Sequence, residues 1–436
     1  MYSLDQAGIP FKKGEYIIKL RGAKYDKSKE QTIVEEFYKA METVNVPKPD
    51  CKTVTTTIVP CDCSDFTYIL IKVICPPNGP SQDDVVVNQP AVVRPGGGGL
   101  IEEINPNYFI YDSRLGASRL DRNLNYSRSN PYQGYIRSRM KLIPRNPVGK
   151  ALNSKTVLVG LVDSGVDITN PDIVSYIANT APLTPFYNND RNGYDFVEHL
   201  SNLGYNRSNI FDYYGHGTHI AQNMIELLNR DFKKNDIRIL PVKVIDRNGY
   251  STVFSASCGL IYAMKKGAKI INASWYNIYS NRQSEGMPFL ETVIQKSNNE
   301  GVMIVTCSGN EGQEIGANDF LVYPAVYNQT YDNVFTVNAD LDNTGGVHLL
   351  SNRGLDYIDL TADGTTPVKI GAATYSGWGT SYATGLVSLG AAVIKFQNPS
   401  YNYLQIRDKL LTIPYSDHAT SPVQNRYNKH YMHSLN

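Results

Sequence analysis

The sequence predicts an α/β protein in which helices cover both faces of a parallel β-sheet, preceded by a small α+β domain. Three observations support this prediction. Beyond residue 156, short apolar stretches of strand length alternate with helical stretches, as in strand–helix–strand units. The first 75 residues instead group several strand-like stretches around one helix. A segment rich in proline and glycine, ending in Gly96–Gly99, separates the two parts.

Length and charge limit the possible classes of protein. A chain of 436 residues can bury a large core and is typical of two domains. The formal net charge is +1, so no broad electrostatic field indicates nucleic acid or a membrane as a partner. Residues 1–19 are polar and lack the apolar stretch of a signal peptide, and no stretch is long enough for a transmembrane helix. We expect a cytoplasmic protein, with secretion by another route as the alternative.

The N-terminal part contains one predicted helix among short strands. Residues 29–43 have helical spacing, with Val34, Phe37, Tyr38 and Met41 on one side. The predicted strands cover residues 14–19, 54–59 and 66–73. We assign residues 1–110 to this domain and its linker. Residues 111–134 are assigned to an exposed connection, because the stretch from Arg114 to Lys141 is basic, rich in tyrosine and without a period.

Residues 135–436 form the predicted second domain. Its apolar strands are expected at residues 157–162, 237–244, 269–273, 302–306 and 334–337. Its helices are expected near residues 220–228, 253–266, 289–299 and 383–396. In parallel sheets of this kind, reactive groups gather at the carboxyl ends of the strands.

The six cysteines fall into two groups. Cys258 and Cys307 stand in apolar surroundings and are predicted to be buried thiols. The other four lie within 25 positions of one another: Cys51, Cys61, Cys63 and Cys75. For these four, free thiols, disulfides and a metal site all stay open. Disulfides need an oxidising compartment, and zinc sites usually contain C-x2-4-C pairs, whereas only C-x-C is present here.

Three polar residues stand at predicted element boundaries. Asp163 ends the first apolar strand, and His216 lies between two glycines just before a helix. Ser381 follows a glycine turn at the start of a helix, where unpaired amides and the helix dipole favour an oxyanion. Each residue also has an ordinary structural interpretation, as a turn aspartate, a packed histidine and a helix cap.

Taken together, these residues match the logic of a catalytic triad. In that chemistry His216 takes the proton of the Ser381 hydroxyl, while Asp163 orients the imidazole ring. Asn310, which directly follows a predicted buried strand, adds an amide that can donate to the oxyanion, together with the Ser381 backbone amide. A metal held by His216 and His219 is less favoured, because no third ligand is near and the spacing is not i, i+4. We expect neither a metal nor a cofactor.

Three motifs make the chain resemble the subtilisin-like (subtilase, peptidase S8) serine proteases. They are Asp-Ser-Gly-Val from 163, Asp-x-x-Gly-His-Gly-Thr-His from 212 and Gly-Thr-Ser-x-Ala from 379, with Ser-Gly-Asn-Glu-Gly from 308 between the last two. The resemblance covers roughly residues 135–400. It implies a subtilisin-like three-layer fold. It also implies a serine endopeptidase, a hydrolase that cleaves peptide bonds through an acyl-enzyme intermediate.

The resemblance further implies two edge strands that bind substrate. One would consist of Ser274, Trp275 and Tyr276, and the other of Gly249, Tyr250 and Ser251, each pairing with the backbone of an extended peptide. Tyr276 departs from the family pattern, which has glycine there, so the specificity pocket is expected to be narrowed or reshaped. The remaining departures are Gln222 for glycine, Thr384 for alanine and Gly385 for proline. The family's usual calcium-binding insertion is not evident.

The N-terminal domain resembles the inhibitory propeptides of this family. This similarity implies a zymogen whose own N-terminal domain acts as an intramolecular inhibitor, besides protein or peptide substrates as partners. We expect self-cleavage between about Tyr108 and Arg139. The alternative function is a catalytically silent subtilase-like protein that binds peptides or regulates. An α/β-hydrolase esterase is disfavoured, because Ser381 lacks the Gly-x-Ser-x-Gly context.

Overall fold

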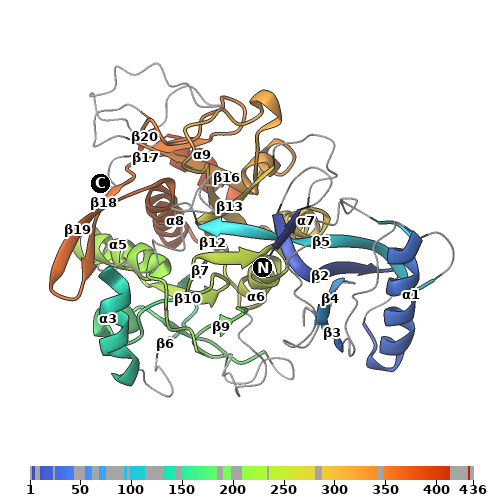
Figure 1. Cartoon of the computed structure of the whole chain (residues 1–436). Helices are drawn as coiled ribbons and strands as arrows, with labels where there is room; N and C mark the ends of the chain where they lie inside the picture. Colours follow the sequence, from blue (N-terminus) through green and yellow to red (C-terminus); the bar gives the residue numbers. More distant parts are fainter. Residues whose placement is uncertain are drawn as a thin grey trace. The chain divides into compact units, whose positions relative to one another are not determined.

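A computed structural model describes most of the chain (Figure 1). The described residues are 2–4, 10–22, 25–43, 55–60, 68–74, 93–95, 99–112, 131–142, 149–183, 190–197, 209–232, 235–279, 287–340, 347–412 and 431–432. They divide into two compact units. The first comprises Met1–Phe109, Thr252–Cys258 and Tyr279–Glu291, and the second Ile110–Ser251, Gly259–Ile278 and Thr292–Asn436. The predicted domain boundaries at residues 110 and 134 remain predictions.

The first unit contains an antiparallel sheet built around β2 (Pro10–Leu20). Strand β2 pairs with β1 (Tyr2–Leu4), with β4 (Tyr68–Ile74) and with β5 (Ile101–Asp112). Strand β3 (Thr55–Pro60) pairs with the other edge of β4. These pairings confirm the predicted strands of the N-terminal part. Their β-branched and aromatic side chains favour a pleated surface with one buried face.

Helix α1 (Glu30–Thr43) supplies the helical part of the core of the first unit. Its buried residues, Ile33, Phe37, Ala40 and Met41, recur every three or four positions and so share one side of the helix. The rings of Phe37 and Tyr16 of β2 lie 5.2 Å apart. The predicted helix is therefore confirmed, with Phe37 and Met41 on its buried side, but Val34 and Tyr38 are only half-buried.

Eight parallel strands make up the main sheet of the second unit in its described part. Their order is β20 (Tyr431–Met432), β17 (Leu360–Ala362), β16 (Val334–Ala339), β14 (Met303–Cys307), β12 (Ile270–Ala273), β7 (Val157–Asp163), β10 (Ile237–Lys243) and β9 (Tyr194–Asp195). The five predicted apolar strands are all present. They are buried except at Arg238, because helices cover both faces of a parallel sheet.

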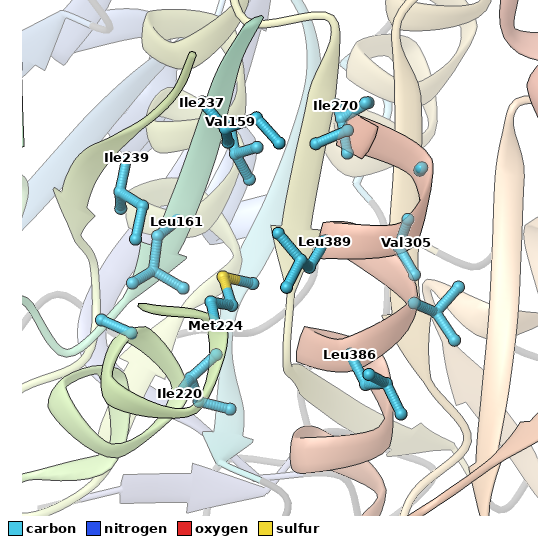
Figure 2. Packing of buried hydrophobic residues seen from close by; sticks show 14 of the residues in the cluster. Val159, Leu161, Ile220, Met224, Ile237, Ile239, Ile270, Val305, Leu386 and Leu389 are labelled. Carbon is cyan, nitrogen blue, oxygen red and sulfur yellow. The ribbon is translucent and has the colours of Figure 1, made fainter. Parts of the chain in front are cut away.

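Two helices pack on one face of this sheet. Ile220 and Met224 of α5 (His216–Asp231), with Leu386 and Leu389 of α8 (Thr380–Gln397), join the cluster that contains the strand residues Val159 and Leu161 (Figure 2). Each fully buried aliphatic side chain contributes roughly 1.5–3 kcal/mol to stability. Among the described helices, none is long and apolar enough to cross a bilayer.

Helix α6 (Val253–Lys265) packs on the opposite face. Gly160 of β7 faces it, because a Cβ atom there would lie 2.9 Å from the Cβ of Ala263. The predicted α/β class, with helices on both faces, is thereby confirmed. Besides α3, the other described α-helices and strands are α4 (Pro171–Val174), α7 (Pro288–Asn299), α9 (Tyr403–Leu411), β6 (Lys150–Ala151), β8 (Ala178–Asn179), β11 (Tyr250–Thr252), β13 (Trp275–Tyr279), β15 (Leu321–Tyr323), β18 (Thr365–Ile370) and β19 (Ala373–Trp378).

Helix α3 (Pro131–Arg139) corrects one expectation. The stretch from Arg114 to Lys141 was predicted to be an exposed connection, but Tyr132 and Ile136, one helical turn apart, are both buried. The Tyr132 hydroxyl lies 3.1 Å from Oγ1 of Thr218. The phenol combines an apolar ring with a polar end, so it can enter a core that offers one hydrogen-bond partner. Residues 113–130 of the predicted connection lie outside the described part.

The two cysteines in the described residues differ in state. Cys307 is a buried free thiol, as predicted, and burial raises the pKa of its thiol group. Cys258 was also predicted to be a thiol, but it is disulfide-bonded, and its partner lies outside the described residues. An apolar neighbourhood suits either state, so local sequence could not separate them. The four clustered cysteines, from Cys51 to Cys75, also lie outside the described residues.

Candidate active site

Asp163 and His216 form a buried pair at the carboxyl end of the sheet. Asp163 is the last residue of β7, and His216 is the first residue of α5. Nδ1 of His216 lies 2.8 Å from Oδ1 and 3.0 Å from Oδ2 of Asp163, and both side chains are fully buried. When Nδ1 of a neutral imidazole donates its proton to a carboxylate, Nε2 is left as the acceptor. Nε2 of His216 has no hydrogen-bond partner among the described residues.

The turn before α5 is held by Asp212. Its Oδ1 accepts hydrogen bonds from the backbone nitrogens of Tyr214 and Gly215. Its Oδ2 accepts from the backbone nitrogen of Thr218 at 2.9 Å and from the Thr218 hydroxyl at 2.7 Å. Burial raises the pKa of Asp212, and the four donors act against that rise. Asp212 thus satisfies amides at the start of α5 and fixes the position of His216.

Gly217 allows α5 to approach the loop after β7. A Cβ atom at Gly217 would lie 2.3 Å from the carbonyl oxygen of Gly165 and 3.1 Å from Oδ1 of Asp163. The Gly217 backbone nitrogen donates to Oγ of Ser164 at 2.9 Å, and the Ser164 nitrogen donates to Oδ1 of Asp163 at 2.7 Å. Only glycine permits this approach, so the Gly-His-Gly motif follows from packing as well as from chemistry.

Ser381 is the second residue of α8 and bonds reciprocally with Ser274. The Ser381 hydroxyl donates to the carbonyl oxygen of Ser274 at 3.3 Å, and the Ser274 hydroxyl donates to the carbonyl oxygen of Ser381 at 3.2 Å. The side-chain amide of Asn272 donates to the Ser274 hydroxyl at 2.9 Å. Hydrogen bonds therefore hold the start of α8 against the segment that follows β12.

Helices α5 and α8 come close together one turn beyond the two candidate catalytic residues. Gly385 lies four residues after Ser381, and Ile220 lies four residues after His216. A Cβ atom at Gly385 would be 2.9 Å from Cγ2 of Ile220, which shows that the helices are tightly packed there. The first turns of α5 and α8 therefore lie at the same end of the sheet. The absence of a side chain at position 385, where the family has proline, permits this contact.

Asn310 lies beside the start of α8. Its Oδ1 accepts from the backbone nitrogen of Thr380 at 3.2 Å and from the Thr380 hydroxyl at 3.0 Å. The amide oxygen is thus directed toward the residue before Ser381, with Nδ2 at the other end of the same amide group. A helix N-terminus and a nearby amide nitrogen are the kinds of donor that stabilise an oxyanion.

One predicted substrate strand pairs with the end of β5. The backbone of β13 pairs antiparallel with it, with Trp275 opposite Asp112 and Tyr276 opposite Tyr111. The side chain of Trp275 is fully buried and donates from Nε1 to the carbonyl oxygen of Val162 at 3.0 Å. Trp275 thus offers only its backbone at this edge.

The other predicted substrate strand is displaced by one residue. Strand β11 begins at Tyr250 and also pairs with β5. Gly249 precedes it in a turn, with φ of +88° and its nitrogen bonded to the carbonyl oxygen of Asp246. A positive φ suits glycine but is not a strand conformation, so the strand begins only at the next residue.

Three residues with clear positioning roles were not singled out from the sequence: Asp212, Glu311 and Asn352. Asp212 stands within a recognised motif, four positions before His216, and this spacing was a usable signal. Asn352 lies 41 positions from its partner Glu311, so no local pattern links them. Among the described residues, no group of three or more His, Cys, Asp or Glu side chains could hold a metal ion.

Comparisons with known proteins identify relatives that are proteases. The thermostable alkaline protease of Halalkalibacterium halodurans is 33% identical over 211 residues, covering 45% of this chain and 51% of the relative. Subtilisin amylosacchariticus of Bacillus subtilis subsp. amylosacchariticus is 28% identical over 268 residues, covering 58% and 59%. The cell wall-associated protease of Bacillus subtilis is 28% identical over 279 residues, covering 62% and 27%. The chain thus spans less than two thirds of the length of each relative.

A solved structure of a cold adapted subtilisin-like serine proteinase matches 67% of this chain and 94% of its own, with 19% identity and a TM-score of 0.48. The family model of the subtilases (Peptidase_S8) matches residues 154–426, which is more than half of the chain. On the strength of that match, this chain belongs to the subtilase family.

Proposed function

We propose that this protein is a serine endopeptidase that uses Asp163, His216 and Ser381 to hydrolyse peptide bonds through an acyl-enzyme. The observation that carries the proposal is the buried Asp163–His216 pair, whose Nε2 lacks a partner among the described residues. Ser381 lies in the first turn of α8, the helix that packs against the helix of His216. Family membership supports the same chemistry.

In the proposed reaction the Ser381 hydroxyl leaves Ser274 and turns toward His216. Nε2 of His216 takes the hydroxyl proton while Oγ attacks the carbonyl carbon of the substrate, and the amide C–N bond then breaks. The same proton passes from Nε2 to the leaving amine. Water, activated by His216, hydrolyses the ester and restores Ser381. The Asp163 carboxylate stabilises the charged imidazole in both halves.

Negative charge develops on the substrate oxygen in each half of this reaction. Nδ2 of Asn310 and the backbone nitrogen of Ser381 are the proposed donors to that oxygen. Donors fixed before the reaction stabilise the transition state more than mobile water does, because they need no reorganisation. The bonds from Thr380 to the Asn310 oxygen support a fixed amide.

The proposed substrate is a protein or peptide in an extended conformation. Strand β13 already pairs antiparallel with the backbone of residues 111–112, and an incoming peptide would pair in the same way. The same contact supports an inhibitory role for the N-terminal part, because residues at the end of β5 occupy the edge that substrate needs. We therefore infer synthesis as a zymogen that cleaves itself.

A catalytically silent peptide-binding protein is the second candidate. The Ser381 hydroxyl donates to Ser274, and this observation favours that candidate, since a nucleophile must reach its base. A fluorophosphonate probe separates the two. Covalent labelling of the folded chain, lost in Ser381→Ala and strongly reduced in His216→Ala, is expected for the enzyme. No labelling of a folded wild-type chain after removal of the N-terminal segment would favour the binding protein.

A further inference from the structure

Strand β13 runs past the candidate nucleophile. Ser274 directly precedes this strand, and its carbonyl oxygen accepts the Ser381 hydroxyl. A peptide that follows the antiparallel register of Asp112–Trp275 places its next residue opposite Ser274. The carbonyl group of that residue is then the one nearest to the Ser381 oxygen. The residues around position 274 therefore decide which side chains can be accommodated before the cleaved bond.

Strand geometry directs that side chain toward Tyr276. Residues directly opposite each other in an antiparallel pair project to the same face, and so do residues two apart in one strand. A peptide residue opposite Ser274 thus shares a face with Ser274 and Tyr276. Tyr276 is its diagonal neighbour, within reach of a long or aromatic side chain. The space available on this face is decided by the tyrosine ring.

The Tyr276 ring already fills this space. It is fully buried in a small apolar cluster. The other buried members of the cluster are Cys307, Ile315, Val322, Ala325 and Ile358. A ring packed on all sides cannot turn away without opening a void in this cluster, so it is a fixed wall.

Hydrogen bonds hold the outer end of the ring. The Tyr276 hydroxyl donates to Oε1 of Glu311 at 2.5 Å and accepts from the backbone nitrogen of Asn310 at 3.4 Å. The side-chain amide of Asn352 donates to Oε2 of Glu311 at 2.7 Å. A Cβ atom at Gly309 would lie 2.5 Å from Nδ2 of Asn352, so this loop is closely packed as well. The tyrosine is thus tied to the loop that carries the proposed oxyanion donor.

We propose that Tyr276 makes this protease cleave after residues with small side chains, namely glycine, alanine or serine. The inference rests on the proposed function and adds the substrate class. A bulky side chain opposite Ser274 meets the tyrosine ring, and its carbonyl carbon is then displaced from Ser381. A small side chain leaves the backbone pairing intact. The backbone nitrogen of Asn310 donates to the Tyr276 hydroxyl, so the ring and the proposed oxyanion donor are linked. A bulky side chain that presses on the ring therefore also disturbs the site that stabilises the transition state.

The test uses the chain after self-processing and peptides that differ only in the residue before the scissile bond. This residue is glycine, alanine, serine, leucine, phenylalanine or lysine. For the wild type, we expect kcat/KM with alanine to exceed that with leucine or phenylalanine by at least about tenfold. Tyr276→Ala removes the ring, so we expect it to raise kcat/KM for leucine and phenylalanine by about tenfold or more relative to alanine. Tyr276→Phe keeps the ring and should keep the preference.

Two results would overturn the inference. One is a wild type that cleaves best after leucine, phenylalanine or lysine; the lysine case would mean that Glu311 receives a basic side chain. The other is a folded Tyr276→Ala variant with an unchanged preference. If Tyr276→Ala does not fold, the wild-type and Tyr276→Phe preferences still decide.

Fluorophosphonate labelling of Ser381 keeps the two proposals apart, because a labelled enzyme with the wrong preference contradicts this one alone. A folded chain that shows neither labelling nor cleavage after removal of the N-terminal segment contradicts both.

Discussion

The carboxylate of Asp163 and the imidazole of His216 are both fully buried and lie 2.8 Å apart. Moving a charge from water into the protein interior costs free energy unless an oppositely charged partner is well placed. Buried pairs therefore occur where other contacts hold both members in position. Here Ser164 fixes the carboxylate, and Asp212 fixes the turn before the imidazole. The pair is therefore an orienting device for the ring more than a source of stability.

Asp163→Asn tests this orienting role. The amide keeps the volume of the carboxylate but can neither stabilise a charged imidazole nor select its tautomer. We expect kcat to fall by about 3 × 10⁴-fold with little change in KM, a magnitude carried over from loss of the triad aspartate in subtilisin, a member of the same family. Asp172→Asn, at an exposed position in α4, is the matched control. Activity within tenfold of wild type in Asp163→Asn would contradict the role.

Asn310→Ala removes one proposed oxyanion donor. We expect kcat to fall by about 10²–10³-fold, or about 2.7–4 kcal/mol of transition-state stabilisation, a value measured on subtilisin itself. Steady-state kinetics on a peptide substrate measures the effect, with Asn153→Ala on the surface as the control. An equal rise in KM with unchanged kcat would instead indicate a role in substrate binding.

Self-cleavage is expected directly after Ser113. Because Asp112 pairs with Trp275, we expect the residue that follows Asp112 in the sequence to meet Ser274 during cleavage. N-terminal sequencing of the processed wild type should therefore begin at Arg114, whereas Ser381→Ala should stay full length. If both chains stay full length, self-processing is wrong. A new N-terminus elsewhere would mean that substrate does not follow this register.

Glu311 should make stability depend on pH in a distinctive direction. Burial raises the pKa of Glu311 above its ordinary value, and the bonds from Tyr276 and Asn352 oppose that rise. A carboxyl group with a raised pKa binds its proton more readily in the folded chain. Glu311 therefore contributes most to stability at pH values below the pKa that it has in the unfolded chain. This contribution is lost as the pH rises through the pKa that it has in the folded chain.

Glu311→Gln removes this titration. We expect the free energy of unfolding of the variant, relative to wild type, to increase as the pH rises from about 4 to about 7. Chemical denaturation at several pH values measures the difference, and Glu314→Gln at an exposed position is the control. A difference that stays constant with pH, or changes in the opposite direction, would contradict the raised pKa.

Thiol counting tests the contrast between the two buried cysteines. In denaturant without a reducing agent, we expect an alkylating reagent to modify Cys307 but not the disulfide-bonded Cys258. In the folded chain Cys307 should also be protected, since it is buried and the pKa of its thiol is raised. A Cys258 that is alkylated without reduction would contradict the disulfide.

The disulfide also bears on location. Disulfides persist in oxidising compartments. We therefore infer that the protein works outside the cytoplasm, which is the alternative location that the sequence left open. The same labelling, applied to protein taken from its own cells in the presence of a thiol-blocking reagent, tests this inference. Reduced Cys258 in that sample would favour the cytoplasm.

By itself the sequence determined the parallel sheet, its covering helices and the positions of the candidate triad. Those features depend on local patterns: apolar runs of strand length, and glycines within two positions of Asp163, His216 and Ser381. Periodicity and backbone freedom act over a few residues, so they can be predicted without tertiary contacts.

Tertiary structure decided what depends on distant partners. Tyr276 meets Glu311 across 35 positions, and Tyr132 meets Thr218 across 86, while Cys258 forms a bond that no local pattern indicates. A tyrosine suits a surface, an interface or a core equally well. Which of these it occupies is settled only when folding brings a partner for its hydroxyl and an apolar wall for its ring, because both are needed to offset the loss of water.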